Sequence, residues 1–384
     1  MKSVAISKCP DYEIHKVRQA VREALGHIGG ISAFVSPGDR VLLKANLLMR
    51  RKPEKATTTH PAVVQAVAEL VVEAGGKPVI CDSPGGYTSH SVGTLDSVYE
   101  FCGMKDAAKA CGAELSYDVE VVDTALPQGR IIKSLRTIRP VLQADKIINL
   151  PKLKTHMMMA FSGAVKNLFG VVPGSAKTEY HFRFENEQDF AGVIVDICEF
   201  VKPTLTVMDA VVGMEGSGPT NGNPRQVGLI LASADPYALD VAAAAAVGLE
   251  PMKLPLVRES ARRGLCSGRP EDVQIAGERL DAVVVKNFQL PANHVAINIW
   301  DWILPKSAAR RVNKAFKFKP RFRHERCRGC GVCARSCPAR AISMKDGRPG
   351  LELNKCISCF CCHELCNFDA VDVTRPWLFK VLFR

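Results

Sequence analysis

Residues 327–338 read CRGCGVCARSCP, and residues 356–366 read CISCFCCHELC. Both stretches contain cysteines at the spacing C-x2-C-x2-C-x3-C, by which small bacterial ferredoxins hold two [4Fe–4S] clusters. Structural zinc sites use separated cysteine pairs instead. The spacing therefore predicts two [4Fe–4S] clusters in a small C-terminal α+β two-cluster ferredoxin-like domain at residues 326–372. It indicates that electrons move through this protein.

The order of the eight cysteines predicts which of them share a cluster. In two-cluster ferredoxins the fourth cysteine of each run binds the cluster of the other run. One cluster is then expected on Cys327, Cys330, Cys333 and Cys366, and the other on Cys356, Cys359, Cys362 and Cys337. Pro338 follows the first run, whereas Asn367 stands at the usual proline position after the second. Cys361 is an additional thiol that we expect not to bind iron.

The rest of the composition is typical of a soluble globular protein. The 384 residues suffice for two or three domains of roughly 100–200 residues each. No apolar run reaches the ~18–20 residues that span a bilayer, and the first residues lack the apolar core of a secretory signal. Fifteen cysteines without an export signal predict a cytoplasmic protein whose cysteines bind metal rather than form disulfides.

Residues 1–295 alternate short apolar runs with segments of helical periodicity. The expected strands are Val41–Leu43, Pro78–Cys81, Lys146–Leu150, Leu205–Met208 and Val227–Leu231, and the expected helices are His60–Gly75, Phe190–Val201 and Tyr237–Val247. Thr58 or Thr59 is the predicted N-cap of the first helix, and Gly75 with Gly76 its stop. The alternation predicts an α/β domain with a largely parallel or mixed sheet and flanking helices.

Two segments flank the cysteine-rich domain. A basic linker is predicted at residues 296–325, and the run from Lys306 to Arg328 contains ten lysines and arginines but one acid, Glu325. We interpret this run as a solvated linker, as a docking surface for an acidic electron donor, or as a contact for nucleic acid or anionic lipid. The tail at residues 373–384 is expected to pack back on the protein or, alternatively, to lie at a membrane interface.

Polar residues gather where the predicted strands end, which is where ligands bind in open α/β sheets. His156, Lys154 and Lys166 are the predicted catalytic residues, because histidine and lysine transfer protons and lysine holds anions as a point charge. The predicted substrate-binding residues are Lys44, Asn46, Asp82, Ser83, Lys152, Thr155, Asn167, Asp209 and Glu215. The alternative for the stretch from Pro151 onward is a surface loop with solvated lysines. Cys81 is also of interest, since it adjoins the loop at Asp82.

These stretches resemble the family catalogued as domain of unknown function 362. The resemblance rests on Lys44–Asn46, Thr59–Pro61, Asp82–Gly85, Pro151–His156 and Gly163–Asn167, and is extended by Asp209–Ala210, Glu215–Pro219 and Asp235–Asp240. It covers most of residues 1–250, with Ala45 where proline is expected. Members of the family often carry a C-terminal two-cluster ferredoxin segment. The resemblance implies the fold and the site, but it implies no substrate.

The leading hypothesis is an iron–sulfur oxidoreductase that passes electrons from a reduced partner through two [4Fe–4S] clusters to an anionic small molecule or cofactor in a Lys/His/Asn-lined crevice. The partner would be a ferredoxin, a flavodoxin or a reductase. In that case Lys152, Lys154, His156 and Lys166 should face the clusters. The alternatives are a non-catalytic electron carrier or assembly factor that docks a partner protein, and an isomerase or transferase with structural or regulatory clusters. Nucleic acid and membrane partners are not expected, and a homo-oligomer is left open.

Overall fold

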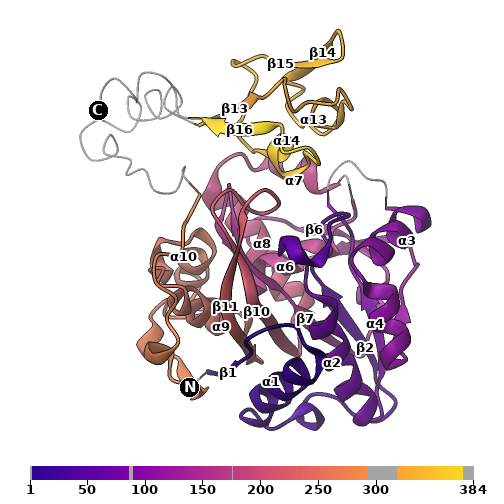
Figure 1. Cartoon of the computed structure of the whole chain (residues 1–384), viewed down its shortest axis with the longest axis vertical. Coiled ribbons are helices and arrows are strands. Elements are labelled where there is room, and N and C mark those ends of the chain that lie inside the picture. The colour runs from indigo at the N-terminus through magenta and orange to yellow at the C-terminus, as the bar shows by residue number, and fades with distance from the viewer. Residues whose placement is uncertain (1, 86–89, 175, 292–317, 375–384) are drawn as a thin grey trace.

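The computed structural model of the chain describes residues 2–85, 90–174, 176–291 and 318–374 (Figure 1). Most of the predicted basic linker and most of the predicted tail lie outside these ranges. Residues up to 291 form a large α/β body, and the cysteine-rich segment forms a small domain at one end of it (Figure 1). Within the described ranges, no helix combines the length and the apolar character needed to cross a bilayer.

The body is built on a ten-stranded sheet with the order β12-β1-β11-β10-β7-β2-β3-β4, to which β8 and β9 are joined through β10. The strands are β1 (Ser3–Lys8), β2 (Arg40–Ala45), β3 (Lys77–Cys81), β4 (Glu114–Leu115), β7 (Lys146–Leu150), β8 (Lys152–His156), β9 (Ala160–Ser162), β10 (Leu205–Glu215), β11 (Asn223–Ser233) and β12 (Gln274–Gly277). Strands β7, β2, β3 and β4 pair in parallel, whereas β11 runs antiparallel to β1 and β10. The sheet is therefore mixed, and the predicted α/β class is confirmed.

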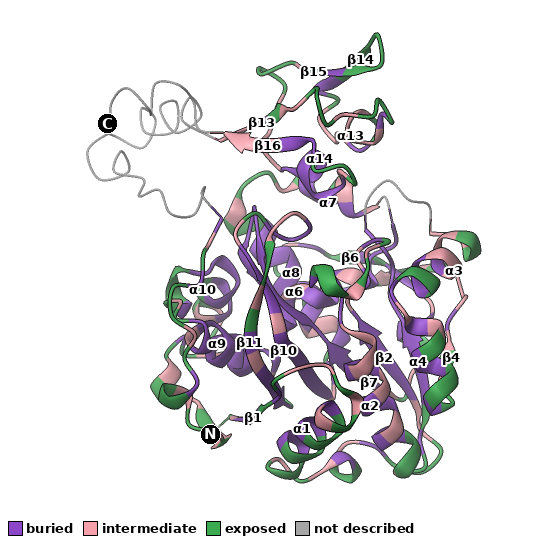
Figure 2. Ribbon diagram, in the orientation of Figure 1, coloured by how far each residue is buried: buried purple, intermediate pink, exposed green. Residues whose placement is uncertain are grey.

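Helices cover both faces of this sheet. One face packs against α1 (Ile14–Gly26), α2 (Pro61–Glu73), α3 (Val92–Phe101) and α4 (Met104–Cys111), and the other against α8 (Glu187–Val201), α9 (Pro236–Ala246) and α10 (Pro255–Arg262). Neighbouring residues of β2 serve opposite faces, because Leu43 packs with the first group and Leu42 with the second, as the two-residue period of a strand requires. Figure 2 shows the helices buried on their inner sides and exposed outside.

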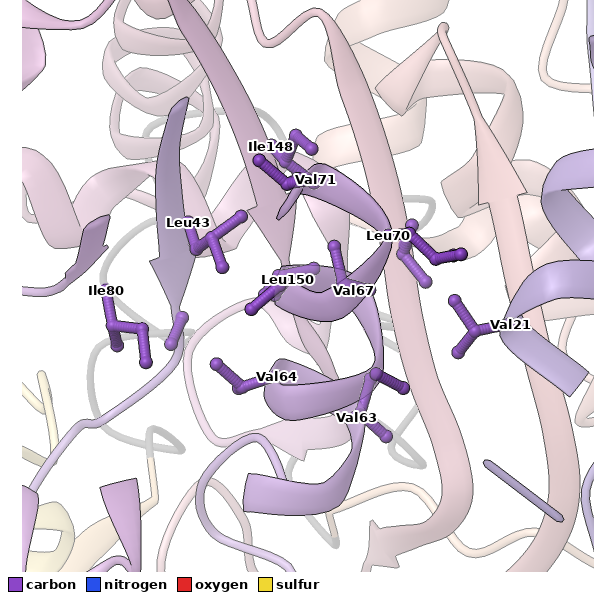
Figure 3. Packing of buried hydrophobic residues seen from close by; sticks show 14 of the residues in the cluster. Val21, Leu43, Val63, Val64, Val67, Leu70, Val71, Ile80, Ile148 and Leu150 are labelled. Atoms are coloured by element: carbon purple, nitrogen blue, oxygen red, sulfur yellow. The ribbon is translucent and has the colours of Figure 1, made fainter. Parts of the chain in front are cut away.

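The packing of α2 shows how the apolar spacing of the sequence forms the core. Five of its buried side chains are Val63, Val64, Val67, Leu70 and Val71. They lie among Leu43, Ile80, Ile148 and Leu150 of the central strands and Val21 of α1 (Figure 3). Burying one such side chain contributes about 1.5–3 kcal/mol, so this cluster fixes α2 against the sheet.

The predicted N-cap of α2 is wrong. His60 is the N-cap, and its side chain accepts a hydrogen bond from the amide of Ala62 while Pro61 occupies the first helical position. Thr59 Oγ1 instead accepts from the Asn46 amide at 2.9 Å and donates to the Leu150 carbonyl at 2.6 Å. The threonine thus joins the ends of β2 and β7, which is a tertiary role that local spacing does not reveal.

Two further predictions about strand ends need correction. Asp209 does not end its strand, because β11 pairs with β10 on both sides of it, from Thr206 to Glu215. The stretch after Pro151 is not a solvated surface loop, because it forms β8, whose residues are all buried, and it pairs with β9. After β9 the chain continues through α6 (Ala164–Asn167), the 3-10 helix η3 (Leu168–Val171) and α7 (Ala176–Arg183).

The C-terminal domain contains two strand pairs and two short helices. Its elements are β13 (Lys319–Phe322) paired with β16 (Val371–Thr374), β14 (Ile342–Lys345) paired with β15 (Arg348–Leu351), α13 (Val332–Arg335) and α14 (Cys361–Glu364). This is the predicted α+β arrangement. The short helix α14 lies on the side that faces the body (Figure 1), so part of the second cysteine run is close to the body.

Candidate active site

A cavity of about 80 Å³ lies between the body and α14. This is several times the ~10–15 Å³ that one water molecule requires. Its polar lining consists of Asn46, Asp82, Ser83, Lys152, Lys154, His156, Ser162, Lys166, Asn167, Lys177, Thr178, His181 and Glu364. Most of the predicted site residues thus meet in one place, and residues of the cluster domain form part of the wall.

Strand β8 supplies three of these side chains because alternate residues of a strand point to the same side. Lys152, Lys154 and His156 line the cavity. Thr155, between them, points away: its Oγ1 accepts from the Gly218 amide at 3.2 Å and donates to the Met214 carbonyl at 3.4 Å. Thr155 is therefore not placed to bind a ligand here, although the sequence predicted that role.

Lys154 is buried, and it forms no ion pair with any carboxylate of the described residues. Its Nζ donates to Asn46 Oδ1 at 2.8 Å and to the Thr57 carbonyl at 2.6 Å. Burial, together with the nearby charge of Lys166, lowers the pKa of Lys154 to about 7. The amine can therefore bind an anion when protonated and can also release its proton near neutral pH.

Lys152 has a different environment, because it forms an ion pair. Its Nζ lies 2.9 Å from Asp209 Oδ2 and donates to the Tyr12 hydroxyl at 2.6 Å. The same hydroxyl donates to Asp209 Oδ1 at 2.8 Å, and the ring of Tyr12 stacks on His60. Lys152 and Asp209, both predicted to bind substrate, therefore neutralise each other in the wall of the site.

His156 connects the body to the cluster domain. Its Nδ1 accepts hydrogen bonds from the amides of Met158 and Met159 at 3.1 and 3.2 Å. The ring proton of the neutral form is therefore on Nε2, which lies 3.3 Å from Glu364 Oε1. Burial raises the pKa of Glu364 to about 7. A histidine N–H and a carboxyl group from two domains thus meet inside the cavity.

Lys44 and Asp82 form a second buried ion pair. Lys44 Nζ lies 2.5 Å from Asp82 Oδ1, and Asp82 Oδ2 accepts from the Leu47 amide at 2.6 Å. Gly170 passes so close that a Cβ there would overlap both charged groups. Asp82 lines the cavity whereas Lys44 does not, so Lys44 positions Asp82 instead of meeting a ligand directly.

Three asparagines form a chain of amide hydrogen bonds under the site. Asn46 Nδ2 donates to Asn167 Oδ1 at 2.9 Å, and Asn167 Nδ2 donates to Asn149 Oδ1 at 2.8 Å. Asn149 in turn donates to the Ala164 carbonyl at the start of α6. Because each amide is fixed by the next, Asn46 presents its Oδ1 to Lys154 in a defined orientation.

Lys166 points into an aromatic part of the cavity. Its ammonium lies 4.9 Å from the centroid of Phe169 and 5.8 Å from that of Phe190. Burial lowers the pKa of Lys166 to about 8. His181 stacks on Phe190 with centroids 4.3 Å apart, and burial, together with the charge of Lys166, lowers the pKa of this histidine to about 3. This side of the cavity therefore holds one ammonium and one neutral imidazole.

Sequence reasoning missed Lys177 and His181, which lie on α7 and line the cavity. Lys177 Nζ donates to the carbonyls of Ser83 and Val172 at 2.8 and 2.6 Å. Burial lowers the pKa of Lys177 to about 7. The other site residues were predicted because they directly follow strands. The sequence AKTEYHFR of α7 does not follow a strand, so Lys177 and His181 could not be predicted in this way.

Two predicted positions lie elsewhere. Glu215, near the end of β10, accepts from the Gln289 amide at 3.1 Å and lies 3.9 Å from Arg225. It does not line the cavity. Cys81 is fully buried, which raises the pKa of its thiol to about 12. A thiol that stays protonated at neutral pH is a poor nucleophile, so Cys81 is a core residue.

The eight cysteines of the C-terminal domain fall into two groups. The thiol of Cys333 interacts with those of Cys327, Cys330 and Cys366, and the thiol of Cys362 with those of Cys356, Cys359 and Cys337. The thiol of Cys362 also interacts with that of Cys333, so the crossed assignment stays a prediction. Eight thiols in two C-x2-C-x2-C-x3-C runs of one small domain are a donor set that fits [4Fe–4S] clusters.

The cluster domain contacts the body through α14 and the residues after it. Thr220 Oγ1 donates to the Glu364 carbonyl at 2.8 Å, and Asn221 Nδ2 donates to the His363 carbonyl at 3.0 Å. Met49 packs against Cys361 and Leu365. The side chain of Cys361 also lines the cavity. The predicted cluster ligand Cys362 is thus the next residue in the chain after a residue of the cavity wall.

Together the fold and the site define an iron–sulfur protein with a role in electron transfer. The sequence model described as 4Fe-4S dicluster domain matches residues 319–367. The model described as Domain of unknown function (DUF362) matches residues 41–245, which is more than half of the chain. The protein therefore belongs to this family.

A curated relative is the thylakoid-associated protein sll1697 of Synechocystis sp. (strain ATCC 27184 / PCC 6803 / Kazusa). It is 35% identical over 298 residues, which cover 76% of this chain and 88% of the relative. Among solved structures, the lactate racemase apoprotein from Thermoanaerobacterium thermosaccharolyticum is 13% identical with a TM-score of 0.39 over 62% of this chain and 55% of that chain. A protein from Thermotoga maritima is 12% identical with a TM-score of 0.32 over 54% and 52% of the two chains.

Proposed function

We propose that the protein is an oxidoreductase that reduces a small anionic substrate in the cavity between the body and α14. The carrying observation is that a lysine-lined cavity has its wall completed by the domain of the cluster cysteines, through Cys361 and Glu364. A free-standing electron carrier has no need for an enclosed cationic site. The two [4Fe–4S] clusters, when bound by the two cysteine groups, supply electrons one at a time.

The residues of the chain supply the other requirements of a reduction. Protonated Lys154 and Lys166 attract the anion and stabilise the negative charge that develops as electrons arrive. Lys154 and the Nε2 proton of His156 are the proposed proton donors. A two-electron reduction would take two electrons from a donor protein, which is oxidised, and two protons from these groups and solvent.

For the electron donor we propose a ferredoxin, a flavodoxin or a reductase with an acidic surface. The support is the cationic exterior of the cluster domain. Exposed Arg321 and Arg326 precede Cys327, exposed Arg328 follows it, and Cys330 is exposed as well. Opposite charges accelerate such encounters. The exposed first cysteine group would then receive electrons, and the group that includes Cys359 would pass them to the cavity.

We also propose a reducing compartment such as the cytoplasm, because the body cysteines are unpaired and mostly buried. The name of the thylakoid-associated relative suggests attachment to a membrane surface as the alternative. Cell fractionation distinguishes the two locations.

The function is tested by reoxidation of the reduced protein. The anaerobic protein is reduced with ferredoxin, mixed with a panel of small anions (2-oxo acids, 2-enoic acids, sulfite), and followed by the visible absorbance of its clusters. We expect at least one anion to reoxidise the protein with saturation, and Lys154→Met to slow this step by roughly 100-fold or more. Equal rates in both proteins would contradict a role for the cavity. No reoxidation by any anion would favour the electron-carrier function.

A further inference from the structure

The charges around the cavity do not balance. Two ion pairs neutralise themselves: Lys44 with Asp82 at 2.5 Å and Lys152 with Asp209 at 2.9 Å. The remaining charged groups of the lining are Lys154, Lys166, Lys177 and Glu364. Among the described residues of the lining, three amines thus face a single carboxyl group.

These three lysines are held by neutral groups. Lys154 donates to an amide oxygen and a carbonyl, Lys177 donates to two carbonyls, and Lys166 lies over two phenylalanine rings. Across the described ranges none of the three forms an ion pair. Buried charges are normally paired, since removing an isolated ammonium from water is costly. Their arrangement is therefore suited to a negatively charged ligand.

We infer that the cavity binds a compact dianion, held between Lys154, Lys166 and Lys177. The inference rests on the proposed function and specifies the class of its substrate: a small molecule that carries a tetrahedral oxyanion or two carboxylates. Ammonium groups that share one small cavity repel one another, and a double negative charge offsets this repulsion more fully than a single one. The cavity of about 80 Å³ requires the charged part of the ligand to be small.

His181 provides an independent indication of a ligand. Only 4% of this residue is exposed, it lines the cavity, and its Nδ1 has no hydrogen-bond partner in the described structure. Buried polar groups almost always have partners. An oxyanion held between the lysines and His181 would accept a hydrogen bond from this ring and so satisfy it.

Calorimetry on the full-length, oxidised, anaerobic protein tests the inference. Sulfate and malonate serve as dianions, and methanesulfonate and acetate as the matched monoanions. We expect each dianion that fits to bind roughly tenfold or more tightly than its monoanion. Titrations at pH 8 in two buffers of different ionisation enthalpy should show proton uptake on binding. Preference for sulfate or for malonate tells a tetrahedral oxyanion from a dicarboxylate.

Variants show whether the lysines cause the preference. Lys177→Met and Lys166→Met should each abolish most of it, whereas Lys253→Met, whose side chain is 75% exposed, should leave it unchanged. Lys166 makes no hydrogen bond within the described chain, so its replacement does not leave a buried partner unpaired. Equal binding of dianions and monoanions, or no binding of either, would overturn the inference.

The binding test can be separated from the test of the proposed function. Calorimetry uses oxidised protein without an electron donor, so it measures binding and no reduction takes place. Tight dianion binding without reduction of any substrate would count against the oxidoreductase only. Reduction of a substrate by a protein that shows no dianion preference would overturn this inference and leave the oxidoreductase standing.

Discussion

The charge of the cavity depends on pH through individual lysines. The pKa of Lys154 and of Lys177 is about 7 and that of Lys166 about 8, so each is cationic below these values and neutral above them. The affinity for sulfate should therefore fall as the pH rises from 6 to 9, by roughly tenfold or more. Isothermal titration across this range measures the effect. An affinity independent of pH would contradict it, and Lys154→Met should show a shallower dependence.

The same residues should lower the stability of the ligand-free protein. Burial lowers the pKa of Lys166 from its ordinary value of 10.5 to about 8. Between about pH 8 and pH 10.5 the unfolded chain therefore binds more protons than the folded one, so the free energy of unfolding rises with pH in this range. At pH 7 the lysine is charged in both states, and burying this charge lowers the free energy of unfolding. Lys166→Met should raise the free energy of unfolding by about 1–2 kcal/mol without anions.

Denaturant unfolding in anion-poor buffer measures this change, with exposed Lys253→Met as the unchanged control. A lower stability of Lys166→Met would mean that its contact with the rings of Phe169 and Phe190 outweighs the cost of burial. Lys166 would then be a structural residue of the cavity.

At the scale of elements, η3 forms part of the cavity wall, and its close passage positions the Lys44–Asp82 pair. A Cβ at Gly170 would overlap both charged groups. Gly170→Ala should therefore destabilise the protein by about 1–3 kcal/mol, as overpacking does. Gly93→Ala on α3 is the matched control, because open space surrounds that position. Thermal unfolding of the two variants makes the comparison, and equal stabilities would contradict the close approach.

Elements with strong apolar periodicity could be predicted from the sequence, and those fixed by tertiary pairing could not. The valines and leucines of α2 and the run Lys146–Leu150 gave the right helix and strand. The extension of β10 beyond Met208 depends on its pairing with β11, to which no local pattern points. Strand β8 escaped prediction as a strand because its lysines and histidine are polar. Their burial depends on tertiary partners, which are Asp209 for Lys152 and the neutral Asn46 and Thr57 for Lys154.

At the scale of the whole molecule, the site joins parts of the chain that are far apart. His156 and Lys154 were predicted from their position after a strand. Glu364 and Cys361 lie some 200 residues later, inside the cysteine motif, and their place in the cavity depends on how the two domains dock. Sequence spacing describes each domain separately, so it could not supply this contact.

The crossed assignment of the cysteines predicts how the domains respond to single replacements. The native protein should contain about eight iron and eight sulfide ions. Cys366→Ser should disturb the cluster of Cys327, Cys330 and Cys333, although Cys366 belongs to the other run. Cys361→Ser should keep the full iron content. Iron and sulfide analysis with electron paramagnetic resonance of the reduced proteins measures both, and loss of iron from Cys361→Ser alone would contradict the assignment.

The central claim is that the lysine-lined cavity is a ligand site next to the iron–sulfur centres. Electron–nuclear double resonance on the dithionite-reduced protein with ¹³C-labelled malonate tests it most directly, after calorimetry has shown that malonate is bound. We predict a ¹³C coupling to a reduced cluster in the native protein and its loss in Lys154→Met. Bound malonate without coupling to either cluster would contradict the claim.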